Sequence, residues 1–599
     1  MKKIYVSILA IGLTAMAGLA QENLNKEITL DKDFVPIEKK ATKKSSLPQV
    51  MKPAQSETTS QLDYSNWAKP TSVTTDIPTM LPFGYRTGHI FSDQRGYFDI
   101  GAGSQLNIVG SAGYRLIDEK DLKVEAWLQH NSTWSGKNST TQIADELLKK
   151  QKYNDNVIGF DLQNKMSAGT LGLGARVHFD NFNYYGGIDN FSDATNWWDN
   201  NKQTFLDVNI GGNWTGKVNV ARYHDITYHA TVKYNYGGYS KGFLYAGPAT
   251  DGLFYKDIDG AKEHYFQAEV GAQYAIKASS DIGMNIRFDY LNRKNHVFVT
   301  ELNALETITR SPSMLTLAPF ITYRGQNLDI RLGADVAFCF NDGAKIRVAP
   351  NAQAAYELSP GMSLFINAKG GKTFNTLSRM AVLNRYSDPN GDYSNTFSPI
   401  DCDFGLKVGP FSGFTATIYG GYGIFKNDMA TYCPVSVQPY AAAYYKTIDS
   451  KGFKVGAKAE YKYRSWAEIS VSGTFAPQDD KFKEGDSYSG YSLGLDRAKF
   501  IANADLNVYP IKELTLNVGF EYRGGRHALL MGPTTDDGYA FSFMEMNNVT
   551  NLKAGASYRF NQMITIWAKA SNLLNKQWDV LNGMGAQKLN IMGGVALVF

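Results

Sequence analysis

The sequence predicts an all-β fold, a transmembrane antiparallel β-barrel with short turns at one end and long loops at the other. Three observations predict it. Apolar and polar residues alternate from about residue 97 onward, the connections between alternating stretches are in turn very short and very long, and the last residues alternate as well. A helical membrane bundle is excluded, because the mean hydropathy is -0.31 and no run of about 20 apolar residues follows the N-terminal stretch.

The alternation is clearest in four stretches, residues 282–290, 328–340, 453–463 and 514–523. In the first, Ile286 and Phe288 lie on one face and Asn285 and Asp289 on the other. Because successive side chains of a strand point to opposite faces, each stretch predicts a strand with one apolar and one polar face. The stretches run for about ten residues, which is the length that crosses hydrocarbon at a barrel tilt, whereas strands in soluble sheets average about five or six. We therefore expect the apolar faces to contact outer-membrane lipids.

Ten short polar stretches are predicted to be periplasmic turns: 118–121, 180–181, 214–217, 278–280, 324–327, 359–361, 409–413, 463–466, 510–513 and 560–562. Long polar connections alternate with them and are expected on the extracellular side: 135–153, 190–202, 240–262, 374–400, 476–494, 525–547 and 573–588. With both ends of the barrel in the periplasm, ten turns and eleven loops join about 22 strands, and two misread turns would make that about 18. The expected strand number is therefore 18 to 22, with about 22 preferred.

The first 96 residues differ from the rest. Lys2 and Lys3 precede an apolar stretch that ends in a small-x-small sequence, so residues 1–20 are interpreted as a secretory signal peptide cleaved after Ala20. Residues 21–96 are rich in proline and lysine and have no sustained periodicity, which predicts an extended periplasmic segment. The barrel is expected to span residues 97–599. A formal net charge of only +4 gives no reason to expect nucleic acid as a partner.

The final alternating stretch has the form of an outer-membrane assembly signal. Its apolar residues share one face and end on an aromatic side chain: Leu589, Ile591, Val595, Leu597 and Phe599. Such a terminal strand is what the barrel-assembly machinery recognises, so that machinery is an expected partner. The N-terminal signal and the final strand together predict an outer-membrane location.

Residues 572–577, with the sequence Asn-Leu-Leu-Asn-Lys-Gln, precede the last long loop and the closing strand. This arrangement resembles the TonB-dependent receptor barrels, especially those of Bacteroidetes, and the strand rhythm from about residue 97 agrees with it. The resemblance implies an outer-membrane barrel that takes up a bulky nutrient. Family members carry an N-terminal plug domain of well over a hundred residues, whereas only residues 21–96 precede the first strand here. A relative without a plug is therefore expected, and coupling to TonB through a box such as residues 27–30 is doubtful.

Two functions follow from this interpretation. The first is a receptor-like or porin-like transport barrel for uptake or permeation of a bulky nutrient. The second is a non-transporting scaffold subunit of an outer-membrane complex with a periplasmic or lipoprotein partner. A lumen of about 22 strands is wide enough to leak. Either the loops fold inward, residues 21–96 lie inside, or a partner fills it.

The polar faces of the predicted strands supply the candidate functional residues. If the apolar faces contact lipid, twelve charged side chains point into the lumen: Arg287, Asp289, Asp329, Arg331, Asp335, Lys454, Lys458, Glu460, Lys462, Glu521, Arg523 and Lys569. Charges of both signs suit a hydrated wall, where neighbours compensate each other. These residues either take part in permeation or only solvate the wall.

No motif predicts an enzyme, a cofactor or a metal. The 8 histidines show neither a His-Glu-x-x-His sequence nor zinc-ligand spacing. Residues 388–392, Asp-Pro-Asn-Gly-Asp, resemble half a calcium loop, but Pro399 occupies the position of the bidentate acid, so a turn is favoured. The 3 cysteines do not form a disulfide framework, although one bridge between Cys402 and Cys433 stays open.

Overall fold

The computed structural model describes a barrel built from residues 94–135, 150–184, 202–221, 224–242, 258–299, 304–434, 444–482, 497–533, 539–581 and 584–599. All of them belong to the unit Pro70–Phe599. The predicted signal peptide and nearly all of the predicted periplasmic segment lie outside the described residues. Among the described residues, no helix is both long and apolar enough to span a bilayer.

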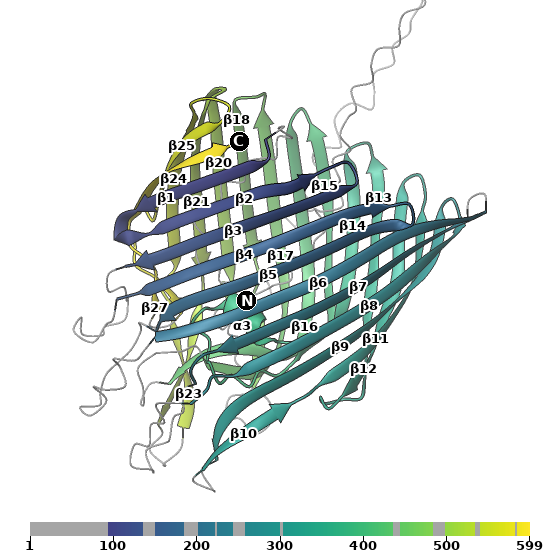
Figure 1. Cartoon of the computed structure of the whole chain (residues 1–599), viewed down its shortest axis with the longest axis horizontal. Helices are drawn as coiled ribbons and strands as arrows, with labels where there is room; N and C mark the ends of the chain where they lie inside the picture. Colours follow the sequence, from purple (N-terminus) through teal and green to yellow (C-terminus); the bar gives the residue numbers. More distant parts are fainter. Residues whose placement is uncertain are drawn as a thin grey trace, which may run out of the picture. The chain divides into compact units, whose positions relative to one another are not determined.

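The strands of the wall follow one another around the barrel in chain order, each antiparallel to the next (Figure 1). They are β1 (Gly96–Gly103), β2 (Ile108–Asp118), β3 (Leu122–Trp134), β4 (Lys152–Met166), β5 (Gly169–Asn183), β6 (Lys202–Ala221), β7 (His224–Tyr239), β8 (Lys262–Lys277), β9 (Ser280–Val299), β11 (Ser313–Arg324), β12 (Leu328–Phe340), β13 (Ile346–Ser359), β14 (Met362–Thr373), β15 (Thr396–Phe411), β16 (Phe414–Pro434), β17 (Tyr444–Tyr463), β18 (Ala467–Phe475), β20 (Phe500–Ile511), β21 (Leu514–Gly524), β24 (Val549–Arg559), β25 (Ile564–Ser571) and β28 (Asn590–Val598).

The sheet is closed by its first and last strands. β1 pairs antiparallel with β28, with Tyr97 opposite Val598, so neither strand presents a free edge. The described sheet contains 26 strand segments. Four of them extend other strands: β10 (Ala304–Arg310) precedes β11, β19 (Gln478–Phe482) follows β18, and β22 (His527–Pro533) and β23 (Tyr539–Glu545) lengthen β21 and β24. The wall therefore has 22 strands, which confirms the preferred strand number.

Most predicted turns are confirmed, but two are wrong. Residues 180–181 lie inside β5 and residues 214–217 lie inside β6, where both stretches pair with neighbouring strands. At this end the chain reverses at residues 167–168, between β4 and β5, and between β6, which ends at Ala221, and β7, which begins at His224. Asp and Asn favour turns in sequence statistics. Here Asp180 instead serves a buried contact with a loop, so its polar character does not mark a chain reversal. Two real turns were not predicted and two predicted turns are wrong, so the predicted number of ten turns is still correct.

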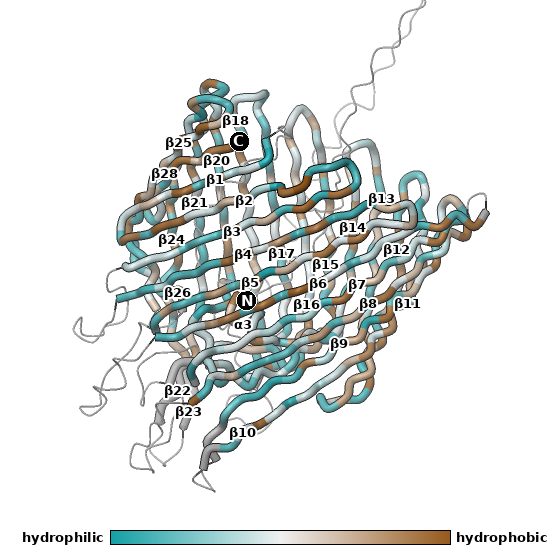
Figure 2. The backbone as a smooth tube through the Cα atoms, in the orientation of Figure 1, coloured by the Kyte–Doolittle hydropathy of each residue, from teal (hydrophilic) through white to brown (hydrophobic). Residues whose placement is uncertain are grey.

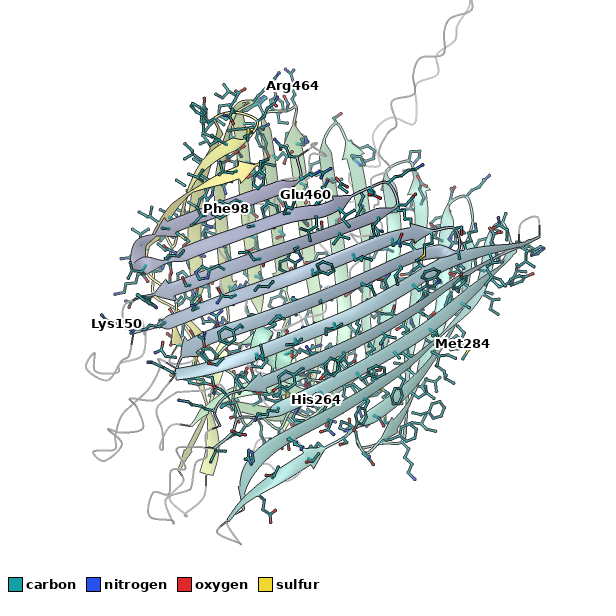
Figure 3. All side chains as sticks on the ribbon, viewed as in Figure 1. Phe98, Lys150, His264, Met284, Glu460 and Arg464 are labelled. Carbon is teal, nitrogen blue, oxygen red and sulfur yellow. The ribbon has the colours of Figure 1, made fainter. Side chains whose placement is uncertain are left out.

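The apolar faces of the strands point away from the lumen. On β9, Ile282, Met284 and Ile286 have 50%, 39% and 38% of their surface exposed, whereas Asp281 and Asp289 on the other face keep only 5% and 1%. Figure 2 shows the same alternation as brown and teal stretches that follow one another along each strand. Figure 3 labels Met284 on the outside of the wall, Lys150 at the long-loop end and Arg464 in a short turn at the opposite end.

The proposed bridge between Cys402 and Cys433 is excluded by the strand register. Cys402 on β15 lies opposite Tyr422 on β16, and Cys433 follows eleven residues later on that strand. Eleven residues of strand extend about 36 Å. A disulfide needs Cα atoms within about 7 Å of each other. Cys402 is a free thiol, and the side chain of Cys433 lies outside the described residues.

Several long connections contain regular structure that the sequence did not predict. Besides β19, β22 and β23, they hold the hairpin of β26 (Asp579–Leu581) and β27 (Met584–Gly585) and the helix α3 (Leu377–Leu383). Thr376 caps α3, because its side chain accepts a hydrogen bond from the backbone N–H of Arg379. The two clusters of buried apolar residues in the described barrel both include residues of the connection between β14 and β15, which contains α3. The apolar rows on the outside of the wall are exposed.

Barrel register can be tested with two neighbouring residues of β9. Replacing Ile286 with arginine places a charge among lipid tails, which costs about 2–4 kcal/mol near the bilayer midplane. We expect Ile286→Arg to reduce the heat-modifiable folded fraction in outer-membrane preparations. Asn285→Arg points the same charge into the lumen and is expected to assemble like the unmodified chain. Equal tolerance of both substitutions would contradict the assigned faces.

Candidate functional site

The connection between β14 and β15, residues 374–395, does not project outward but crosses the lumen, and we call it the crossing loop. Figure 1 shows its helix α3 at the long-loop end of the barrel. Its described residues contact the inner faces of strands β4 to β9 on one arc of the wall and of β17 on another. The loop therefore bridges separate parts of the barrel near its extracellular mouth.

Apolar packing holds α3 against the wall. Leu377 and Met380 have 0% and 1% of their surface exposed, whereas Val382 on the other side of the helix has 60% exposed. Burying side chains of this size contributes about 1.5–3 kcal/mol each relative to leaving them in water. The cluster around them draws residues from β5 and the residue after it, β6, β7, the connection before β8, the crossing loop and the connection after β25: Phe182, Tyr184, Phe205, Tyr239, Ala261, Tyr386, Tyr393 and Met584.

A buried arginine fixes the middle of the crossing loop. Arg385 donates to Asp155 on β4 over 2.5 Å, and its Nε atom also donates to Asp180 on β5. The guanidinium stacks on the ring of Tyr153 at 3.9 Å. His178 completes the group, with its Nε2 atom 2.9 Å from Asp155. Two carboxylates thus share one guanidinium that belongs to the loop and not to the wall.

A second buried ion pair binds both ends of the crossing loop. Arg293 on β9 and Glu263 on β8 form a pair with 2% and 0% of their side chains exposed and an N–O distance of 2.5 Å. Arg293 donates to the carbonyl oxygen of Asn375 at 2.6 Å and of Tyr393 at 3.2 Å. Glu263 accepts from the backbone N–H of Leu377 at 3.0 Å. The pair therefore satisfies backbone groups of the loop that would otherwise lack partners away from water.

Smaller polar contacts complete the attachment. The hydroxyl oxygen of Ser378 lies 2.7 Å from Oδ1 of Asp207 and 2.8 Å from Oδ1 of Asn235, and its single proton is donated to one of these two acceptors at a time. A Cβ atom built on Gly237 of β7 would lie 2.6 Å from that hydroxyl oxygen, so α3 lies directly against the backbone of β7 at this point. On the other side, Ser387 lies 3.0 Å from the hydroxyl of Tyr445 on β17.

Residues 388–392 form a turn, as predicted. Asp388 accepts from the backbone N–H of Asn390 at 2.9 Å through its carboxylate, and from that of Gly391 at 3.1 Å through its carbonyl. Burial raises the pKa of Asp388 to about 6, and the hydrogen bond from Asn390 lowers it only in part. The carboxylate is thus used to shape the turn.

The twelve side chains predicted to line the lumen lie on the face opposite the exposed apolar rows, and most have local partners. Arg287 pairs with Asp289 at 2.9 Å, Lys458 with Glu460 at 2.5 Å, and Arg523 with Glu521 at 2.8 Å. Further contacts are Lys454 with Asp403 at 2.5 Å, Lys462 with Glu468 at 2.7 Å, Asp335 with Asn351 at 2.9 Å, Arg331 over Phe320 at 3.7 Å and Lys569 over Trp567 at 4.5 Å. Asp329 lies on β12 opposite Ala355. These residues are spread over several strands and form no single cluster, so their part in permeation stays a prediction.

No pattern in the sequence indicated the ion-pairing residues that hold the crossing loop. Arg385 lies in a segment predicted only as a long polar connection, and its partners lie on other strands far away along the chain. One signal was present: Thr376 followed by Leu377, Met380 and Ala381 is typical of a capped amphipathic helix.

The described residues hold one group with the donor atoms of a metal site. Oxygen and nitrogen atoms of Asp155, His178 and Asp180 all lie within 4.8 Å of one another. Arg385 makes ion pairs with both carboxylates of this group.

No family model and no curated protein match this sequence. Among solved structures, the chain is similar to the siderophore receptor PirA from Acinetobacter baumannii, with 10% identity, a TM-score of 0.62, and coverage of 84% of this chain and 80% of that one. The chain is also similar to a mutant of the ferric enterobactin receptor PfeA from Pseudomonas aeruginosa, with 12% identity, a TM-score of 0.61, and coverage of 85% of this chain and 81% of that one. For the FrpB iron transporter from Neisseria meningitidis, the identity is 11%, the TM-score is 0.60, and the match covers 85% of this chain and 82% of that one. At these identities the likeness shows the fold, and it confirms the predicted resemblance to receptor barrels at that level.

The grip of Arg385 on the crossing loop can be measured by amide hydrogen exchange. Breaking a buried ion pair by removing one partner costs about 3–5 kcal/mol. We expect Arg385→Gln to accelerate exchange of the amides in residues 377–395 by about two orders of magnitude or more. Arg310→Gln removes an exposed pair with Asp392 of the same loop, and a surface pair contributes about 1 kcal/mol at most. Similar acceleration in both variants would contradict a dominant role for Arg385.

Asp388 predicts a pH-dependent attachment of the crossing loop. Its pKa in the docked loop, about 6, lies above the ordinary value of about 3.9. Because this pKa is raised, the contribution of Asp388 to the free energy of loop docking is fully present below about pH 4 and is lost as the pH rises through about 6. We expect Asp388→Asn to slow exchange of loop amides relative to the unmodified chain at pH 7.5, and to leave it unchanged at pH 4. Faster exchange in the variant at pH 7.5 would contradict the assignment.

Proposed function

We propose that this chain is an outer-membrane uptake barrel for a bulky nutrient, closed at rest by its own crossing loop and opened when a ligand releases that loop. The observation that carries the proposal is the attachment of the loop to separate arcs of the wall through a buried apolar cluster and two buried ion pairs. Of the three ways to fill the lumen, inward folding of a loop is the one with contacts among the described residues.

Barrel size supports closure by a dedicated element. A wall of 22 strands encloses a lumen wide enough for a large solute, and an unobstructed lumen of that size would leak. An element that both closes the lumen and can leave it suits a gated pore better than a scaffold. No observation favours the alternative of a non-transporting scaffold subunit.

The nutrient class is proposed by analogy with the similar structures. Those proteins are described as receptors or transporters for siderophores, ferric enterobactin or iron. A bulky iron chelate is therefore the first candidate nutrient for this chain. Residues 27–30, the candidate contact with TonB, lie outside the described residues.

A reversible disulfide tests the gate directly. Gly237 of β7 and Ser378 of α3 lie close enough for Gly237→Cys with Ser378→Cys to form a bridge. We expect Arg385→Gln to give large openings in planar bilayers. Adding both cysteines to that variant is expected to close the pore after oxidation and to reopen it on reduction. Each single cysteine in the same background is the matched control and should conduct regardless of redox state.

A second arm separates the crossing loop from the N-terminal segment. The chain lacking residues 21–93, which leaves β1 whole, is expected to stay closed while the crossing loop is intact. Openings in that truncated chain, together with silence in Arg385→Gln, would assign closure to the segment and overturn the proposal. Silence in both would favour the scaffold alternative.

A further inference from the structure

The inner wall near the crossing loop carries a compact set of cation-binding side chains. Asp155 on β4 lies directly opposite Asp180 on β5, and His178 precedes Asp180 by two residues, which places it on the same face of the strand. Donor atoms of all three residues lie within 4.8 Å of one another. They are largely withdrawn from solvent, with exposed side-chain fractions of 23%, 14% and 6% for Asp155, His178 and Asp180. We call them the donor triad.

The cation now bound to the donor triad comes from the crossing loop and not from the wall. Arg385 supplies the guanidinium, and among the described residues no other arginine or lysine makes an ion pair with Asp155 or Asp180. If the crossing loop left the wall, both carboxylates would lose this charge. Two carboxylates held directly opposite each other repel when no cation lies between them. The triad would therefore bind another cation in place of Arg385.

A second observation indicates that the guanidinium of Arg385 does not provide a partner for every carboxylate oxygen of the triad. Atom Oδ1 of Asp180 is buried and has no hydrogen-bond partner among the described residues, while Oδ2 binds Arg385. A buried carboxylate oxygen without a partner costs about 1–3 kcal/mol or more. The guanidinium is planar and its N–H groups point in fixed directions, so it leaves this oxygen unused. A metal ion is small and accepts donors from several directions.

The donor chemistry selects the class of metal. Two carboxylate oxygens and one imidazole nitrogen suit zinc and similar divalent transition metals. Calcium and magnesium prefer oxygen ligands alone. Ligands held about 2.0–2.2 Å from zinc lie roughly 3–4 Å apart, so the widest separation in the triad needs to shrink by about 1 Å.

We propose that the donor triad is a binding site for a divalent transition-metal ion, and that this ion and Arg385 compete for it. Metal binding then releases the crossing loop from the wall, because the two cations cannot be held by the same carboxylates. By linkage, the factor by which the docked loop weakens metal binding equals the factor by which bound metal weakens docking of the loop. The inference rests on the proposed gate for its functional meaning. Metal binding is measured without transport, so either idea can fail alone.

Cobalt(II) is the probe for the site. The full mature chain, free of any histidine tag, is titrated in detergent with Co²⁺, and ligand-field absorption reports binding to nitrogen and oxygen donors. We expect Arg385→Gln to bind Co²⁺ at least about tenfold more tightly than the unmodified chain, since the competing cation is gone. Adding Asp180→Asn or His178→Gln to that variant is expected to abolish the gain, and Zn²⁺ should displace the cobalt spectrum.

Arg176→Gln is the matched control. Arg176 lies on β5, on the same face as His178, and pairs with Asp207 at 3.2 Å without contacting the triad. Arg176→Gln removes one positive charge close to the triad, as Arg385→Gln does. An equal gain in Co²⁺ affinity in both variants would mean that only the general electrostatic field changed, and it would overturn the proposal. Unchanged affinity in Arg385→Gln would overturn it as well.

A second readout uses the unmodified chain and does not depend on any variant folding. Saturating Zn²⁺ is expected to accelerate hydrogen exchange in residues 377–395 by about tenfold or more, and to leave exchange in the distant strand β21 unchanged. Metal binding with no change in loop exchange would overturn the competition.

Discussion

Backbone hydrogen bonding in hydrocarbon is the constraint on which the rest of this structure depends. Every N–H and C=O group of a membrane-spanning strand needs a partner in the protein, because lipid tails offer none. The chain meets this demand by returning to its starting point, with β28 beside β1 and Phe599 exchanging backbone hydrogen bonds of 2.7 and 2.9 Å with Gly96. Once the sheet is closed, apolar side chains face outward and polar ones inward. The lumen then becomes a place where charge is tolerated and a loop can dock.

Docking gives the barrel an interior that resembles a soluble protein. Apolar side chains under the crossing loop are buried almost completely, with Leu377 and Tyr184 at 0% exposure, although a membrane barrel has no need of a core. The same region holds a buried ion pair between Arg385 of the loop and the wall, and a second pair within the wall, Arg293 with Glu263, that hydrogen-bonds to the loop backbone. Buried ion pairs add little net stability but strongly penalise any arrangement that breaks them. They therefore specify one docked position for the loop, which apolar packing alone would leave adjustable.

The sequence was sufficient for the wall because strand patterning is local. Alternation around Ile286 assigns two faces to β9 without knowledge of its neighbours, and the number of short connections gives the number of strands. Asp180 shows where local reasoning fails: its polarity suggested a turn, whereas its role is to bind Arg385, 205 residues away along the chain. The interior site was beyond reach for the same reason. Asp155, Asp180, Glu263 and Arg293 look like ordinary inward polar positions until the fold brings a distant loop onto them.

The crossing loop also braces the wall mechanically. A closed sheet can change from a round to a flattened cross-section by small changes in strand tilt and twist, without breaking the hydrogen bonds between its strands. Contacts from one loop to β4 and β5 on one side, and to Tyr445 of β17 on another, resist such flattening at the extracellular mouth. Removing the brace changes the shape of the mouth as well as emptying it. Under the proposed gate, the largest solute admitted would be set by the compliance of the rim and not by a fixed diameter.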